Sequence, residues 1–149
     1  MSIVPYRETQ PLQFVPFQPA DAEQVVRLFV EVYGDAYPIK KVYDPQQLIQ
    51  AAQSESYIPF VARGAEGQVV AYGALCRSAP FKGIYELVQG IVSSDFRGGG
   101  IGRTMFEYVE RLLTTLPGAE TYFGEAVCNH LHTQKACAHI KSIDTGLEL

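Results

Sequence analysis

One segment of the sequence has the residue types that bind phosphate groups. It reads Arg97-Gly98-Gly99-Gly100-Ile101-Gly102-Arg103. The residues that follow have the apolar spacing of a helix, and the first turn of a helix carries free N–H groups and a partial positive charge. Phosphates bind at such turns, and glycine removes the Cβ that would block a close approach. The segment therefore predicts a cradle for a diphosphate, with flanking arginines that can add charge-assisted hydrogen bonds.

A flexible turn before a helix is the alternative interpretation of this loop. Glycine fills four of the five positions 98–102. Each glycine costs about 0.5–1 kcal/mol of conformational entropy relative to alanine. A purely structural turn requires neither that cost nor two arginines beside it, so we favour the phosphate site.

Two common nucleotide-binding loops fit this segment poorly. A P-loop ends in Gly-Lys-Ser/Thr, whereas here Gly102 is followed by Arg103 and Thr104. A dinucleotide fingerprint GxGxxG would need its last glycine at Arg103, and it normally follows the first strand of a βαβ unit. The loop here follows the fourth predicted strand. A nucleotide-binding fold therefore remains only an alternative, which competition by ATP or NAD would reveal.

Apolar periodicity predicts the elements of the first half of the chain. Residues 12–17 alternate as a short edge strand. Pro19 opens a helix that Gly34 ends. A second helix begins at Asp44, with a capping-box pattern and proline at its first helical position.

Strands and helices alternate in the second half. Strands are predicted over residues 57–63, 69–75, 84–92 and 121–128, and helices over 102–113 and 131–141. Glu107 and Arg111 are spaced to pair on the outer face of the first of these helices. A last strand begins near Thr145 and is incomplete. The order β-α-α-β-β-β-α-β-α-β favours an α+β fold with a mixed sheet over a doubly wound one.

Length and charge exclude several classes of protein. The 149 residues suit one domain, with residues 1–11 as an arm and 12–149 as the domain. A net charge of −4 with only 12 Lys and Arg gives no domain-wide basic surface for nucleic acid. No apolar run approaches the roughly 18 residues of a membrane span, and the first residues lack a secretory pattern. We expect a cytoplasmic protein without nucleic-acid or membrane partners.

The cysteines and histidines do not predict a disulfide or a metal site. The three cysteines, Cys76, Cys128 and Cys137, form no CxxC pair, and we expect them to be small buried residues. His130, His132 and His139 lack the further ligands that a zinc site needs.

The loop and its surroundings resemble the GNAT (Gcn5-related N-acetyltransferase) family. Arg97, Gly100 and Gly102 match its signature R/Q-x-x-G-x-G/A, and the strand 87–92, the helix after the loop and the element order from residue 12 also fit. The resemblance implies a mostly antiparallel mixed sheet flanked by helices, and acetyl-CoA as acyl donor without a metal.

The resemblance also implies which residues contact the acyl donor. The pantetheine arm would pair with the strand backbone at Gly90, Ile91 and Val92, where an N–H would polarise the thioester carbonyl. The implied contacts are Gly90, Ile91, Val92, Arg97, Gly98, Gly99, Gly100, Ile101, Gly102, Arg103 and Asn129. Arg103 either reaches the 3′-phosphate or lies in solvent, and Asn129 either touches the donor or only caps the last helix.

Glu86 is the candidate catalytic residue. It stands eleven residues before Arg97, the spacing at which the histone acetyltransferase branch of the family keeps its general base. An exposed or ion-paired structural role is the alternative, and Glu125 is a second candidate base. Aligning Gly146 with the family's late glycine puts Cys137 where many members have a tyrosine general acid. The thiolate would then leave as such or take a proton from water.

The expected activity is transfer of an acetyl group from acetyl-CoA to a primary amine of a small molecule or peptide. A domain that only binds or senses acyl-CoA within a larger protein is the alternative. The incomplete last strand predicts either a further C-terminal segment or a partner chain, such as a second copy, that completes the sheet.

Overall fold

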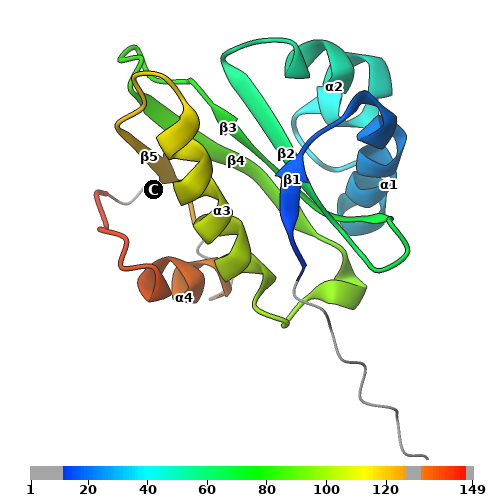
Figure 1. Cartoon of the computed structure of the whole chain (residues 1–149). Coiled ribbons are helices and arrows are strands. Elements are labelled where there is room, and N and C mark those ends of the chain that lie inside the picture. Colours follow the sequence, from blue (N-terminus) through cyan, green and yellow to red (C-terminus); the bar gives the residue numbers. More distant parts are fainter. Residues whose placement is uncertain (1–11, 127–131, 147–149) are drawn as a thin grey trace, which may run out of the picture.

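A single five-stranded sheet organises the chain. The computed structural model describes residues 12–126 and 132–146 (Figure 1). The strands are β1 (Phe14–Pro16), β2 (Tyr57–Arg63), β3 (Val69–Cys76), β4 (Ile84–Val92) and β5 (Thr121–Gly124). They lie side by side in chain order. Neighbouring strands run antiparallel except β4 and β5, which run parallel. The prediction of a mostly antiparallel α+β fold is confirmed.

Helices cover both faces of the sheet (Figure 1). On one face, α1 (Ala22–Tyr33) and α2 (Pro45–Ala52) enclose a core that includes Phe29, Tyr72 and Ile91. On the other, α3 (Ile101–Thr115) covers a core that includes Tyr85 and Met105. The last helix, α4 (His132–His139), lies beside α3. The apolar stripes of α1 and α3 thus fix the sheet between two layers of helix.

The predicted helix boundaries hold with small changes. The helix expected from Pro19 begins as a 3-10 turn, Pro19–Asp21, before α1, and Gly34 ends α1 at a φ of +57°. The Asp44 carboxylate accepts hydrogen bonds from the N–H groups of Gln46 and Gln47 at 2.9 and 3.4 Å, as a capping residue does. A further 3-10 turn, Lys40–Tyr43, was not predicted.

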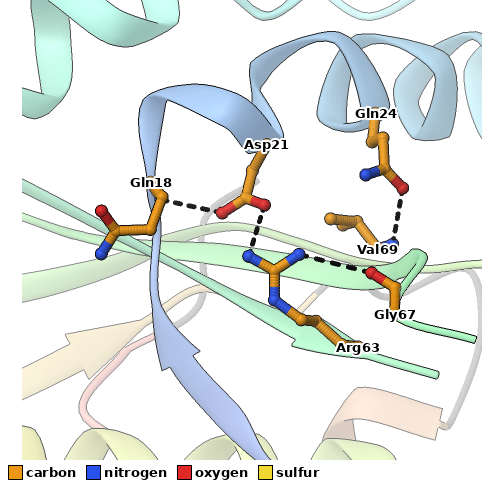
Figure 2. Close-up of polar contacts among 6 residues, drawn as sticks. All are labelled: Gln18, Asp21, Gln24, Arg63, Gly67 and Val69. Carbon is orange, nitrogen blue, oxygen red and sulfur yellow. Dashed lines mark hydrogen bonds and ion pairs between the residues drawn. The ribbon is translucent and has the colours of Figure 1, made fainter. Parts of the chain in front are cut away.

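A buried ion pair connects the start of α1 to the β2–β3 hairpin (Figure 2). The side chain of Asp21 is almost fully buried and accepts a hydrogen bond from Arg63 at 2.5 Å and one from the N–H of Gln18 at 2.8 Å. Nearby, the N–H of Val69 donates to the Gln24 side chain at 2.9 Å. A buried charge needs such partners, and these contacts tie the start of α1 to the β2–β3 hairpin.

Three sequence predictions need correction. The strand predicted to reach Cys128 ends at Gly124. Thr145 and Gly146, where the last strand was expected to begin, are not in a strand, and the rest of that expected strand falls outside the described residues. Glu107 pairs with Arg103 at 2.8 Å, and the predicted pairing with Arg111 is wrong. Both arginines stand four residues from Glu107, and spacing alone could not choose between them. The predicted cap Asn129 falls outside the described residues.

Candidate active site

The outer edge of β4 opens halfway along the strand. Its parallel pairing with β5 runs from Ile84↔Thr121 to Leu87↔Gly124. Beyond that point, residues 88–92 have no strand partner on this side within the described part of the chain. Unpaired backbone groups on a strand edge are ready to bind another extended chain. Three predicted donor contacts, Gly90, Ile91 and Val92, lie on this open edge.

A bulge interrupts β4 at the same place. Tyr72 pairs with Ile91 and Ala74 with Val88, so β4 advances three residues while β3 advances two. Gln89, inside this interval, has a φ of +59°. One extra residue in a strand reverses the facing of every residue after it. The bulge therefore decides which N–H groups of the open edge face outward.

The glycine loop continues from the end of β4 into α3. Gly98 and Gly100 have φ values of +86° and +76°, a left-handed conformation that glycine adopts without strain. Apart from the glycine and the residues on either side of it, no atom lies within 4 Å of the place where a Cβ would stand at Gly98 or Gly100. The Arg97 Nε donates to the Val92 carbonyl at 3.2 Å, which ties the loop to the strand. The first turn of α3 thus has an open approach, as a diphosphate cradle requires.

The other loop glycines have different surroundings. Gly99 and Gly102 have ordinary φ values, and a Cβ at Gly102 would only touch Ala136 of α4, at 3.8 Å. Ile101, by contrast, is buried and anchors the start of α3 in the core. The backbone conformation therefore requires glycine at Gly98 and Gly100. At Gly99 and Gly102, the absence of a side chain leaves the backbone accessible.

Glu31, on α1, also contacts the start of the loop, and no sequence pattern indicated it. Its carboxylate accepts hydrogen bonds from the Ser93 hydroxyl at 2.9 Å and from the Ser94 N–H and hydroxyl at 3.1 Å each. Burial alone would raise the pKa of Glu31, but these bonds and the charge of Arg97 together hold it below 4.5. Glu31 is thus ionised at neutral pH and connects α1 to the loop.

Arg103 is engaged with neighbouring side chains. Its Nε donates to Glu107 at 2.8 Å, and its Nη1 lies 2.9 Å from the His139 Nε2, which therefore accepts. The side chain is 58% exposed. Contact with a 3′-phosphate would have to share the guanidinium with these two partners.

The two candidate bases line one pocket. A cavity of about 270 Å³ on the α1–α2 side is lined by Tyr37, Ile39, Glu86, Leu87, Val88, Gln89 and Glu125. Glu86 comes from β4, and Glu125 directly follows β5. The structure therefore brings the two acids to the pocket beside the open edge of β4. Carboxylates in a partly apolar pocket suit an ammonium group.

Cys137, the residue expected at the tyrosine position of the family, lies on α4. The thiol is half-buried, and burial raises its pKa, so it is protonated at neutral pH. The Cys137 carbonyl accepts a hydrogen bond from the Ser142 hydroxyl at 2.9 Å. Cys76, the other cysteine in the described part of the chain, is also half-buried rather than fully buried as predicted. Cys128, Asn129 and His130 fall outside the described residues.

Residues 12–126 and 132–146 contain neither a metal-binding cluster nor a membrane-spanning helix. No cluster of three or more His, Cys, Asp or Glu there has metal-binding geometry. No helix in the same ranges has the length and hydropathy to cross a bilayer.

Comparisons with known proteins agree on the fold. The model of the family described as Acetyltransferase (GNAT) matches residues 22–137. AAC(6')-Iy, solved with the bisubstrate analogue CoA-S-monomethyl-acetylneamine, superposes with a TM-score of 0.74 at 15% identity over 94% of this chain and 96% of that one. Mutant forms of the spermidine/spermine N-acetyltransferase of Vibrio cholerae give 0.72 at 13% identity, covering 91% and 81%.

Glucosamine-6-phosphate N-acetyltransferase of Arabidopsis thaliana gives a TM-score of 0.67 at 12% identity, covering 94% of this chain and 97% of that one. No curated protein matches the sequence. At these identities the structural likeness shows the fold, and the acceptors of these enzymes differ from one another.

Proposed function

Because the chain belongs to the acetyltransferase (GNAT) family, we propose that it transfers an acetyl group from acetyl-CoA to a primary amine. The observation that carries this proposal is the continuity of two features. The open edge of β4, residues 88–92, leads directly into the glycine loop at the start of α3. One ligand with an extended amide-containing arm and a diphosphate could contact both.

The residues of the chain would divide the binding of the donor between them. The backbone of Gly90, Ile91 and Val92 pairs with the pantetheine arm, and an N–H of this edge polarises the thioester carbonyl. The N–H groups after Gly100 bind the diphosphate, supported by the charge of Arg97. The empty space around Gly98 and Gly100 supports this fit.

Glu86 serves as the base in this proposal. It accepts a proton from the acceptor's ammonium group, directly or through water, and the freed amine attacks the acetyl carbon. The C–S bond then breaks, CoA leaves as a thiolate, and the thiolate takes up the second proton of the amine nitrogen through water. Orienting both reactants contributes roughly 7–11 kcal/mol, and the base adds about 10²–10⁴-fold. The support for Glu86 is that it lines the pocket beside the open edge, and Glu125 in the same pocket is the second candidate.

A second candidate function is binding of acyl-CoA without turnover. It is favoured by Cys137, a half-buried thiol on α4, if the sequence alignment that puts it at the position of the family's tyrosine general acid holds. A protein with this function would bind CoA through the same loop and edge, but it would leave the thioester intact in the presence of amines.

Thiol release from acetyl-CoA with a panel of amines tests the proposal. The panel should include monoamines, diamines, an aminosugar and a peptide with a free N-terminus, and mass spectrometry should identify the N-acetyl product. Amine-dependent thiol release with a matching product supports transfer. CoA binding without any amine-dependent release would instead favour the second candidate.

A further inference from the structure

Gln89 is the residue at which the backbone of β4 departs from a regular strand. Its φ of +59° lies in the left-handed region, which residues other than glycine, asparagine and aspartate seldom adopt. Such a conformation persists only where the surrounding structure holds it. The question is therefore what holds Gln89.

A chain of three buried polar side chains supplies the answer. The Tyr57 hydroxyl donates its proton to Gln89 Oε1. The Tyr57 hydroxyl has only this one proton to donate. In its contact with the Tyr72 hydroxyl, 2.5 Å away, Tyr57 is therefore the acceptor and Tyr72 the donor. The three residues are only 5% (Tyr57), 0% (Tyr72) and 9% (Gln89) exposed. With little water to compete, each hydrogen bond strongly favours one arrangement.

The two tyrosines are themselves fixed. The Lys41 Nζ lies 4.1 Å from the centre of the Tyr57 ring, and Phe29 packs edge-on against Tyr72 with ring centres 5.7 Å apart. Burial raises the pKa of Tyr57 to about 12, so its hydroxyl remains a donor throughout the neutral range. The hydroxyl chain thus connects Gln89 to the part of the core beneath α1.

We propose that Tyr57 and Gln89 are a positioning pair that sets the β4 bulge and thereby selects the backbone donors of the open edge. Successive residues of a strand direct their N–H groups to opposite edges. Beyond the bulge, Val92 pairs with Ala71 and Ile91 with Tyr72. A strand without the extra residue would exchange the N–H groups directed at β3 with those directed outward. The inference rests on the proposed function, in which this edge binds the acyl donor.

Two matched substitutions separate positioning from general stability. Tyr57→Phe removes the bond to Gln89, whereas Tyr72→Phe removes a neighbouring buried hydroxyl and leaves the Tyr57–Gln89 bond in place. We expect Tyr57→Phe to lower kcat about 10-fold, as small misplacements of reacting groups do. We expect the kcat of Tyr72→Phe to stay within about 3-fold of wild type, because the Tyr57–Gln89 bond remains and the reacting groups are not misplaced. The KM for the amine should change little in both.

Glycine at position 89 provides a rescue that a merely structural role would not show. Gln89→Gly adopts a positive φ without strain and leaves no amide unpaired. The double variant Tyr57→Phe with Gln89→Gly should therefore recover most of the lost kcat. Gln89→Ala, which lacks both the tether and the freedom of glycine, should not recover it.

NMR of the ligand-free proteins tests the inference independently of turnover. Couplings that report the sign of φ should show a positive φ at residue 89 in wild type and Tyr72→Phe, and a loss of that state in Tyr57→Phe. An unchanged coupling in Tyr57→Phe, or equal kcat losses in the two tyrosine variants, would overturn the positioning pair. Wild type with the expected couplings but no acetyl transfer would overturn the proposed function alone.

Discussion

The glycine loop and the acid pocket lie along one strand, yet they are built in different ways. The loop depends on backbone: left-handed residues at Gly98 and Gly100 and the first turn of α3. The pocket depends on side chains from separate elements, with Glu86 on β4 and Glu125 after β5. An open backbone suits the diphosphate, which is the same in every acyl-CoA. Converging side chains suit recognition of the amine acceptor and transfer of its proton.

This difference assigns separate tasks to the two regions. Under the proposed function, changes in the loop should weaken binding of the acyl donor. Changes in the pocket should lower turnover while donor binding stays intact.

Among the substitutions in the pocket, Glu86→Gln should lower kcat the most. It preserves size but removes the proton acceptor, so kcat at pH 7 should fall about 10²-fold, or about 2.7 kcal/mol of transition-state free energy. The affinity for CoA should not change. The loss should shrink as pH rises, because an alkyl amine with a pKa of about 10.4 is then increasingly neutral. Steady-state kinetics from pH 7 to 9.5 measure this.

Glu125→Gln is the matched control for that substitution. It removes the other carboxylate of the same pocket, and kcat should stay within a few-fold of wild type. If Glu125→Gln loses the 10²-fold and Glu86→Gln does not, the base is Glu125 and Glu86 is structural.

Asp21→Asn should change stability without affecting either region. Hydrogen bonds to charged groups contribute about 1.5–3 kcal/mol, so loss of the buried carboxylate should lower the free energy of unfolding by about 2 kcal/mol. At roughly 2–4 °C per kcal/mol, that is a clear fall in Tm. Glu23→Gln removes the exposed pair with Arg27, which is 3.4 Å long, and should cost under about 1 kcal/mol. Equal melting temperatures for the two variants would contradict the role of Asp21.

Glu31→Gln should have a smaller, pH-dependent effect on the loop. Because the folded pKa of Glu31 is below 4.5, its ionised form stabilises the fold above that pH, and the contribution is lost as pH falls through the folded pKa. The carboxylate is largely exposed, so the contribution should be under about 1 kcal/mol. The Tm difference between wild type and variant should be constant from pH 7 to 5 and narrow below 4.5. A difference that widens in acid would contradict this account.

Arg103→Ala should have the smallest effect. The guanidinium is exposed and shared with Glu107 and His139, so a contact with the 3′-phosphate should contribute under about 1 kcal/mol. Affinities for CoA and dephospho-CoA measure it. Wild type should prefer CoA slightly more than the variant does, and an identical preference in both would show that Arg103 does not contact this phosphate.

The same contrast explains what the sequence could predict. The loop was found because glycines before an apolar helical stripe are visible along the chain, and β2 and β4 were predicted with their observed bounds because turns flank them. Glu86 was named from its spacing to Arg97, and Glu125 because it falls within the strand predicted over residues 121–128; in the structure it directly follows β5. These features depend on local sequence.

The bulge and its supports were not predictable in this way. Tyr57, Tyr72 and Gln89 are far apart in sequence and meet only after three strands have paired in register. Glu31 lies on the helix surface, where a glutamate has no distinguishing pattern. Contacts made by tertiary folding leave no periodic signal along the chain. The sequence therefore could not indicate which residues contact the bulge at the open edge of β4.

Calorimetric titration of CoA into wild type and Gly100→Asp tests the central claim most directly. The substitution adds a Cβ at a φ of +76° and a negative charge beside the first turn of α3. We predict one CoA bound per wild-type chain and an affinity at least about 10-fold lower in the folded variant, which corresponds to about 1.4 kcal/mol. Equal affinities in the two folded proteins, or no binding to wild type, would contradict the assignment of the glycine loop as the diphosphate site.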